Sequence, residues 1–407
     1  MNASGRDPIA AFYDAHPYPP PVADLDAVAS RSAAGPDRVA HHLIWPGRDP
    51  DEIGTLLVAG CGTSQAARHA LRNPHLDVVG VDVSETAIAH TQQLVERYDI
   101  TNLHVERVPI ERVGELGRRF DHIVCTGVLH HLADPLVGLR SLRSVLAPGG
   151  AVTLMVYAPY GRTGISLIQD YCRRLGISTD PADIADLVAV LSEIPDGHPL
   201  SRLLRSSPDF QHDDALADAL LNPRERAYSV PDLLELLTDA GLRFGRWERQ
   251  APYLPDCGSI SETPHADRIA ALPVDDQYAA LELFRGTIDR HTVIAFADDD
   301  ETSCGVAFDR PERLVPIAMP TALVVDDPAR LPTGAAAALL NRAHTSSDLV
   351  MFVDASELDI FRRIDGVRTV AELGAELGDG AGSFVERLWR HDLVVVDATG
   401  ATAGGAG

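Results

Sequence analysis

Apolar residues in the first 300 positions form short continuous runs that alternate with amphipathic segments. The runs cover residues 55–60, 77–82, 120–127 and 151–158. Runs of this length are typical of strands buried on both faces. Residues 84–98 and 134–150, which lie between runs, carry apolar side chains at helical spacing. This alternation predicts parallel βαβ units and an α/β doubly wound sheet of the Rossmann-like kind.

The pattern changes over residues 160–226, where helical segments follow one another with no strand between them. A helical insertion after a late strand lies near the carboxyl edge of the sheet, where ligands bind. We therefore predict that this insertion forms a helical lid or an acceptor pocket. Residues 229–248 then return to a helix and a strand, and residues 291–297 supply a last strand, so that the first domain spans residues 51–300.

Residues 301–313, in an acidic stretch, read as a linker. The following residues 314–400 predict a helix, an Asp-Gly turn, two helices and a closing strand, which fits a small α+β, winged-helix-like domain. The Gly- and Ala-rich residues 401–407 are expected to be a disordered tail.

Residues 1–50 are interpreted as an N-terminal arm and cap. Four prolines within residues 12–25 predict an extended segment that is not helical. Tyr13 and Tyr18 suggest that this arm lies against a ligand, and a disordered N-terminus remains the alternative.

Composition narrows the function classes. The chain of 407 residues has 59 acidic and 35 basic side chains and a net charge of −24, which disfavours nucleic acid as a partner. No long apolar run or secretion signal is visible, and five cysteines are scattered without a CxxC pair. We expect a cytoplasmic bacterial protein with no membrane partner, no disulfide framework and no metal site.

The stretch "VAGCGTS" at residues 58–64 ends a predicted strand with Gly60 and Gly62. A dinucleotide fingerprint requires a third glycine or an alanine at the position of Gln65. Asp82, about twenty residues further on, suits a carboxylate that accepts hydrogen bonds from ribose hydroxyls. These residues alone fit either a dinucleotide or an S-adenosylmethionine site.

Two longer segments, "VVGVDVSETAIAHTQ" and "FDHIVCTGVLHHLADPLVGLRSLRSVLAPGGAVTLMVY", resemble the class I S-adenosylmethionine-dependent methyltransferases over roughly residues 50–160. The resemblance implies S-adenosyl-L-methionine as cofactor and methyl transfer to a nucleophilic nitrogen or oxygen. It places Gly60 and Gly62 at the methionine and ribose, Asp82 at the ribose hydroxyls, Val108, Pro109 and Ile110 at the adenine, and Thr126 and Gly127 at the methionine end.

The chain departs from this family in two places. The acidic residue and the third glycine of the family's first motif are Val58 and Ser64 here. Gln65 is our candidate to replace the missing contact with the methionine amino group. At the adenine, where the family often has an aspartate, His104 and Glu106 are equal candidates.

Methyl transfer requires an aligned acceptor and, for a hydroxyl, a general base. The residues after the fourth and fifth strands are the candidates. We predict His130, Tyr157 and Tyr160 as catalytic, with His130 the histidine that faces the ligand. Substrate contacts are predicted for Tyr13, Tyr18, His131 and Arg162. For each of these residues, a purely structural role is the alternative.

The segment "ELFRGTIDRH" contains Glu282, Arg285 and His291, which we interpret as a solvated helix face. Further on, "FRRIDGVRTVAELGAEL" resembles winged-helix modules that bind precursor peptides. This domain is expected to bind a peptide or to join two protomers in a homodimer. The favoured acceptor is a protein or peptide group, with a small natural product or a non-catalytic cofactor-binding scaffold as alternatives.

Overall fold

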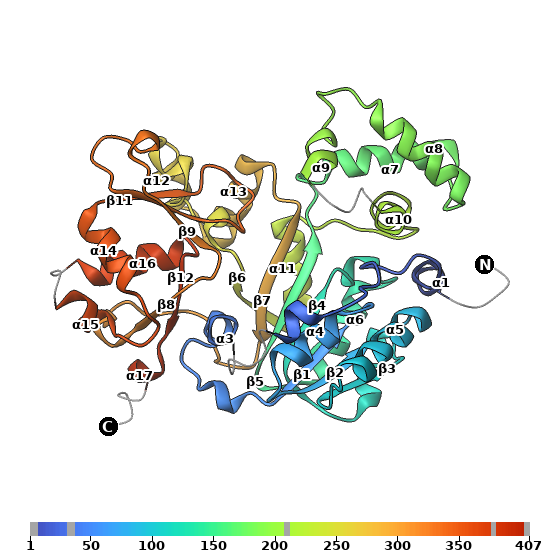
Figure 1. Cartoon of the computed structure of the whole chain (residues 1–407), viewed down its shortest axis with the longest axis horizontal. Coiled ribbons are helices and arrows are strands. Elements are labelled where there is room, and N and C mark those ends of the chain that lie inside the picture. The colour runs from blue at the N-terminus through green and yellow to red at the C-terminus, as the bar shows by residue number, and fades with distance from the viewer. Residues whose placement is uncertain (1–6, 31–36, 207–211, 376–379, 403–407) are drawn as a thin grey trace.

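A seven-stranded sheet forms the centre of the computed structural model, which describes residues 7–30, 37–206, 212–375 and 380–402 (Figure 1). The strand order is β3 (Leu103–Glu106), β2 (Asp77–Val81), β1 (Thr55–Ala59), β4 (Phe120–Thr126), β5 (Leu146–Tyr157), β7 (Arg290–Ala297) and β6 (Leu242–Trp247). Only β7 runs antiparallel to its neighbours β5 and β6. The predicted doubly wound α/β fold is confirmed.

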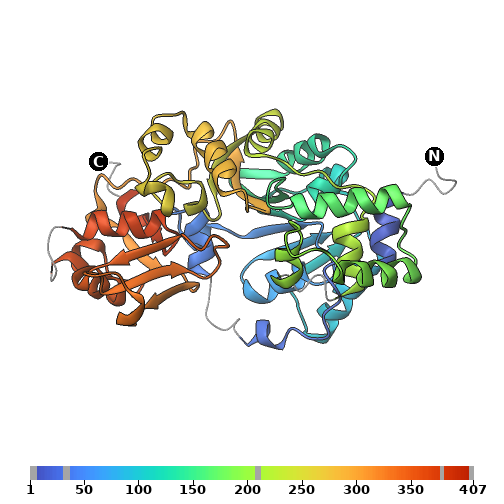
Figure 2. The same ribbon diagram turned by 90° about the horizontal axis from the view of Figure 1, so that it is seen from above.

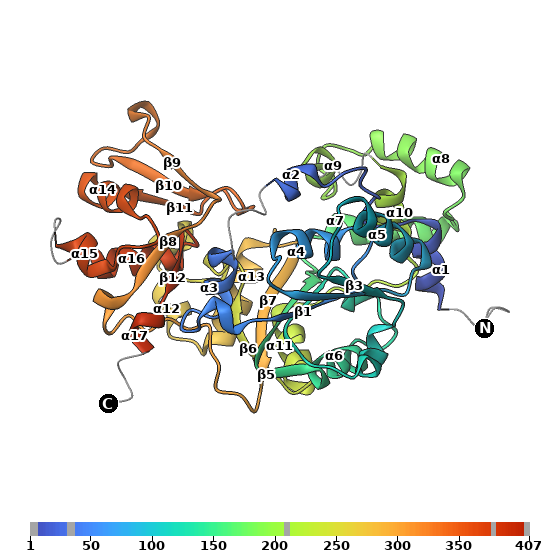
Figure 3. The same ribbon diagram turned by 60° about the horizontal axis from the view of Figure 1, so that its bottom comes forward.

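Helices cover both faces of the sheet (Figure 3). One face packs against α2 (Asp26–Ala29), α3 (Arg38–Ile44), α4 (Gln65–Arg72) and α5 (Glu85–Arg97). The other packs against α6 (Pro135–Ser144), α11 (Val230–Asp239) and α13 (Val274–Arg285), and α12 (Ala266–Ala270) lies against α13. Because both faces are covered, residues 56–59 of β1 are at most 1% exposed, which explains the continuous apolar run.

The lid, residues 160–226, consists of helices in its described part. They are α7 (Thr163–Leu175), α8 (Pro181–Ser192), α9 (Ser201–Ser206) and α10 (Asp213–Leu221). Phe12 of the arm packs into the apolar core that these helices form. The lid therefore sits with α1 on one side of the sheet (Figure 1).

The prediction that residues 12–25 are extended is wrong for the first part of the arm, which is helical. Helix α1 covers Pro8–Ala15, with Pro8 in its first turn and the Asp7 side chain accepting the N–H of Ile9. A proline is tolerated at a helix start, where its missing N–H has no helical partner. The next proline is Pro17, which disfavours a helical conformation at the residue before it, and the helix ends at Ala15.

The C-terminal unit, residues 314–402, has its own apolar core. Its helices are α14 (Ala355–Arg363), α15 (Val370–Gly374), α16 (Ala381–Arg390) and α17 (Thr399–Thr402). Strands β9 (Ala322–Val325), β10 (Ala337–Asn341) and β11 (Val350–Val353) form an antiparallel sheet, and β8 (Val315–Ala318) pairs with β12 (Val394–Asp397). The winged-helix interpretation stays a prediction, as do the domain boundaries, and residues 403–407 of the predicted tail lie outside the described residues.

Polar contacts fix the C-terminal unit to the end of the sheet that lies opposite the lid (Figure 2). The buried Asp392 carboxylate accepts the N–H groups of Gln250 at 3.1 Å and Ala251 at 2.9 Å. Arg246 lies 3.4 Å from the same carboxylate. Removing one of these partners would leave a buried charge uncompensated, so the contacts join the two parts of the chain into a continuous structure.

The prediction of a solvated face at residues 282–291 is wrong. Glu282 and His291 are at most 1% exposed and lie 3.0 Å apart, and the Tyr253 hydroxyl lies 2.7 Å from Nδ1 of His291. These three side chains are hydrogen-bonded to one another, which allows their polar groups to be buried. In the part of the chain that the structure describes, none of the helices combines the length and the apolar character needed to cross a membrane.

Candidate methyl-transfer site

A cavity of about 470 Å³ opens where β1, β2, β4 and β5 end, beneath the lid and the arm. It brings together thirteen of the predicted site residues. They are Tyr13, Tyr18, Gly60, Gly62, Gln65, Asp82, Val108, Ile110, Thr126, Gly127, His131, Tyr157 and Arg162. The residues that remain outside its wall are Pro109, His130 and Tyr160.

The glycine loop, residues 60–64, requires glycine on steric grounds. Gly60 has φ +72° and Gly62 has φ +54°, in the left-handed region that other residues avoid. A Cβ atom on Gly60 would lie 2.3 Å from a methyl group of Val128. Val128 therefore packs directly against the backbone of Gly60, and a side chain at this position would force Val128 to move.

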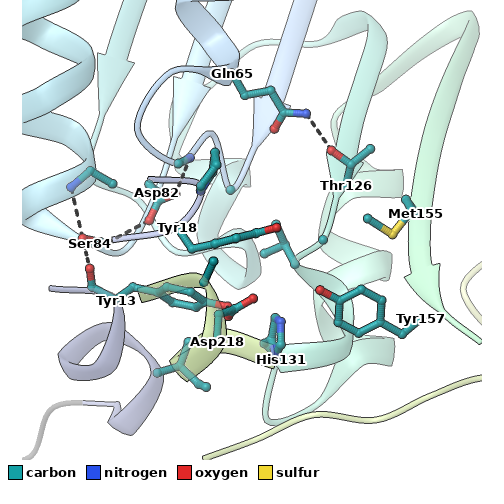
Figure 4. A pocket seen from close by; sticks show the side chains of 18 of the residues that line it. Tyr13, Tyr18, Gln65, Asp82, Ser84, Thr126, His131, Met155, Tyr157 and Asp218 are labelled. Atoms are coloured by element: carbon teal, nitrogen blue, oxygen red, sulfur yellow. Dashed lines mark hydrogen bonds between the residues drawn. The ribbon is translucent and has the colours of Figure 1, made fainter. Parts of the chain in front are cut away.

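Asp82 follows β2 and faces this loop (Figure 4). Its carboxylate accepts the N–H of Gly62 at 2.8 Å and the N–H of Ser84 at 2.9 Å. Burial raises the pKa of Asp82, while these backbone donors oppose the rise. Each oxygen keeps a further lone pair, so the group is able to accept ribose hydroxyls. The glycine loop, whose two glycines line the cavity, and this carboxylate fit the ribose and methionine of S-adenosylmethionine.

Gln65 lies at the start of α4 and reaches β4. Its Nε2 donates to the Thr126 hydroxyl at 2.6 Å. The amide nitrogen is therefore engaged, and the carbonyl oxygen is the end available to accept from an amino group. The proposed replacement of the family's acidic residue by Gln65 stays a prediction.

The opposite end of the cofactor half is apolar. Val108 and Ile110 line it together with Val83 and Ala87, which the sequence analysis did not single out. His104 and Glu106 are exposed residues of β3 and lie outside the wall. Neither of the two candidates for the adenine amino group is therefore placed to contact a ligand in this cavity.

The arm closes the cavity over the glycine loop. A Cβ on Gly62 would meet Pro19 Cδ and the Tyr18 carbonyl oxygen at 3.1 Å, and the Thr63 hydroxyl donates to the Pro19 carbonyl at 2.8 Å. The Asp14 carboxylate accepts the Ser84 hydroxyl at 2.8 Å. These contacts hold Tyr13 and Tyr18 on the cavity wall, where the sequence analysis placed them.

Side chains from three segments meet at the other half of the cavity, below the lid (Figure 4). The Tyr13 hydroxyl donates to Asp218 of α10 at 2.8 Å, and burial, followed by the nearby Asp218 charge, raises the pKa of Tyr13. Arg162 donates to both oxygens of Glu225 at 2.9 and 3.0 Å and lies 3.5 Å from the ring centre of Tyr157.

The structure reverses the expected roles of the two histidines after β4. His131 lines the cavity, whereas His130 packs beneath it with its ring centre 4.0 Å from that of Tyr157. Burial, together with His131 and Arg162, lowers the pKa of His130, so it is neutral. Both residues belong to a short 3₁₀ helix, Leu129–His131, in which neighbouring side chains point to different sides. Tyr160, 39% exposed, also lies outside the cavity, so its predicted catalytic contact is not supported by its position.

Asp218 is the main wall residue that sequence analysis missed. It lies on α10 among the buried Ala215, Ala217 and Leu220, and it is itself 3% exposed. The available signal was an acidic residue among the apolar positions of an amphipathic helix. Acidic side chains are rarely buried unless they have a partner, so this position indicated a polar contact.

Comparisons with known proteins agree with this geometry. Residues 57–152 match a family described as a methyltransferase domain. A Synechococcus protein, "Uncharacterized protein syc1184_c", is 31% identical over 297 residues, which cover 70% of each chain. The ubiquinone biosynthesis O-methyltransferase of Acinetobacter baumannii is 26% identical over 98 residues, 24% of this chain and 41% of that enzyme.

Among solved structures, PKMT2 from Rickettsia typhi in complex with AdoHcy superposes with a TM-score of 0.63 and 14% identity. The match covers 90% of this chain and 76% of that chain, and it concerns the fold. Fold and site together define a class I methyltransferase. The chain belongs to the S-adenosylmethionine-dependent methyltransferases, in one family with the Synechococcus protein, and S-adenosyl-L-methionine is its cofactor.

Proposed function

We propose that this enzyme transfers a methyl group to a nucleophilic nitrogen or oxygen of a protein or peptide. The observation that carries the proposal is the position of the C-terminal unit. Its loop residues 343–346 form a small second pocket with Asp289 and Arg290, and these two residues also line the main cavity. An acceptor too large for the cavity is able to contact this loop while one of its side chains enters.

The chain's own residues have three tasks in this reaction. S-adenosylmethionine supplies an electrophilic methyl group. Asp82 and the glycine loop hold the cofactor, while the lid and the arm cover the reacting atoms and exclude water. Tyr157, whose ring contacts both Arg162 and His130, directs its hydroxyl into the cavity and orients the acceptor (Figure 4).

The direct test incubates the enzyme and methyl-tritiated S-adenosylmethionine with a bacterial lysate that keeps its small molecules. Label is then measured separately in acid-precipitated protein and in the small-molecule filtrate, from which unreacted S-adenosylmethionine is first removed by chromatography. The proposal predicts label in protein, lost in an Asp82→Ala enzyme, and mass spectrometry then identifies the modified residue. Label confined to the filtrate would contradict the proposal and favour a small-molecule acceptor.

A further inference from the structure

Asp218 is a buried carboxylate that faces the cavity without a charged partner. Its Oδ1 accepts the Tyr13 hydroxyl at 2.8 Å and the Asn222 amide at 3.1 Å. Its Oδ2 has no hydrogen-bond donor among the described residues. An ionised carboxylate is costly to bury when it is not paired, and buried titratable groups that face a cavity cluster at functional sites.

Two arginines of the cavity wall, Arg162 and Arg290, are paired with other carboxylates. Arg162 is bound by both oxygens of Glu225, and the Arg290 side chain lies 3.8 Å from Asp289. Each of these pairs is locally neutral. The remaining charge at this end of the cavity is that of Asp218, so the acceptor half attracts a cation.

Tyrosines surround this charge. Tyr13, Tyr18 and Tyr157 all line the cavity, and the Tyr18 and Tyr157 hydroxyls point toward one another across it (Figure 4). The Tyr157 ring is occupied by Arg162, which leaves its hydroxyl as the group directed at a ligand. Aromatic rings and hydroxyls beside a carboxylate are a favourable environment for an ammonium group.

His131 adds a proton acceptor to the same end. Its Nδ1 lies 2.7 Å from the Arg224 carbonyl oxygen, and this contact requires the proton on Nδ1. Its Nε2 then carries a lone pair, and this buried atom has no hydrogen-bond partner among the described residues. The ring stands between Asp218 and Tyr157 (Figure 4).

We infer that Asp218, His131 and the three tyrosines form a subsite for the ammonium group of an aliphatic amine, such as a lysine side chain. This inference rests on the proposed transfer to a protein or peptide and names the class of acceptor. Asp218 binds the cation, and His131 removes its proton.

The amine loses a proton before its nitrogen attacks the methyl group. The ammonium group R–NH₃⁺ gives one proton to Nε2 of His131, beside the compensating charge of Asp218. The nitrogen lone pair of R–NH₂ then forms the bond to the methyl carbon while the C–S bond breaks and its electron pair passes to sulfur. The products are R–NH₂CH₃⁺ and S-adenosylhomocysteine, and His131 later returns its proton to water.

The binding test uses the full chain saturated with S-adenosylhomocysteine. Calorimetry compares Nα-acetyl-lysine methylamide with the norleucine analogue, which lacks the amine. We expect the lysine probe to bind about tenfold more tightly, and Asp218→Asn to abolish that preference. Asp186→Asn, which removes an exposed charge of the same lid, is the control and should keep it.

Three results would contradict the proposed subsite. In the first, wild-type enzyme binds S-adenosylhomocysteine but does not bind the lysine probe. In the second, both probes bind equally well, and in the third, Asp218→Asn keeps the preference for the lysine probe. Failure of the proposed function would give a different result. If label entered small-molecule amines and the lysine preference still depended on Asp218, the subsite would stand and the protein acceptor would be rejected. If label entered a protein hydroxyl, the protein acceptor would stand and the ammonium subsite would be rejected.

His131→Asn separates proton transfer from binding, since its amide N–H can still reach the Arg224 carbonyl oxygen while Nε2 is lost. We expect kcat for methyl transfer to the lysine probe to fall by about 100-fold, with KM changed by less than about threefold. His104→Asn, at an exposed position outside the cavity, should leave both constants unchanged. An unchanged kcat in His131→Asn, or no methyl transfer to the bound probe by wild-type enzyme, contradicts the assignment of the proton acceptor.

Discussion

The two halves of the cavity are built in different ways. In the cofactor half, the backbone conformation at the strand ends shapes the site. Gly60, Gly62 and Asp82 come from two consecutive βα turns. In the acceptor half, side chains from distant segments meet, so that Tyr13 and Asp218 are hydrogen-bonded across 205 positions of sequence. The cofactor half therefore depends on local backbone conformation, whereas the acceptor half depends on how the arm packs against the lid.

The largest effect that would test this difference is expected in the glycine loop. Gly60→Ala forces a side chain into a left-handed conformation and against Val128, so we expect the free energy of unfolding to fall by about 2–4 kcal/mol. Gly117→Ala is the matched control. It has φ +65° but nothing within 4 Å of its added Cβ, and should cost only about 1 kcal/mol. Denaturant unfolding measures both, and equal losses would contradict the steric argument.

Asp82→Ala should have the next largest effect, this time on the cofactor alone. Loss of two charge-assisted hydrogen bonds to the ribose weakens S-adenosylhomocysteine binding by about 2–3 kcal/mol, or about 30- to 150-fold. Calorimetric titration measures the change. An unchanged affinity would remove Asp82 from the cofactor site.

Tyr13→Phe tests the acceptor half with a smaller change. The variant removes one hydrogen bond to the Asp218 carboxylate, and we expect the free energy of unfolding to fall by about 1–2 kcal/mol while S-adenosylhomocysteine affinity stays the same. Thermal unfolding and calorimetry on the same preparation check both parts. A parallel loss of cofactor affinity would show that the halves are coupled through the arm.

The smallest predicted effect is a gain in stability. Burial raises the pKa of Asp218 above its ordinary value of 3.8, so the stability it contributes when protonated is lost as the pH rises through the raised pKa. Asp218→Asn does not titrate, and we expect its melting temperature at pH 8 to exceed that of the wild type by about 2–4 °C. The difference should shrink as the pH falls toward 3.8, and equal melting temperatures at pH 8 would contradict the cost of this buried charge.

The same contrast explains what the sequence could predict. The sheet, the lid helices and the glycine-loop residues follow from local periodicity and short motifs. Which histidine of residues 130–131 faces the cavity depends on how one short turn packs, and the pairing of Tyr13 with Asp218 depends on the arm meeting the lid. The burial of Glu282 with His291 likewise requires contacts between separate elements, and charge patterning alone suggested solvent.

Strands β8 to β11 of the C-terminal unit were not predicted for a related reason. Each has only four or five residues, and β9 is half exposed, so its apolar pattern is short and weak. Two capping boxes and the helix-spaced apolar residues made the helices of this unit easier to recognise than its strands, as in α14, where Asp354 and Glu357 cap the first turn.

Titration of wild type, Asp82→Ala and Asp218→Asn with S-adenosylhomocysteine tests the separation of the two halves most directly. Wild type and Asp218→Asn should bind with the same affinity, and Asp82→Ala about 30- to 150-fold more weakly. If Asp218→Asn weakened the cofactor as much as Asp82→Ala, Asp218 would belong to the cofactor half, and the proposed division of the cavity would be wrong.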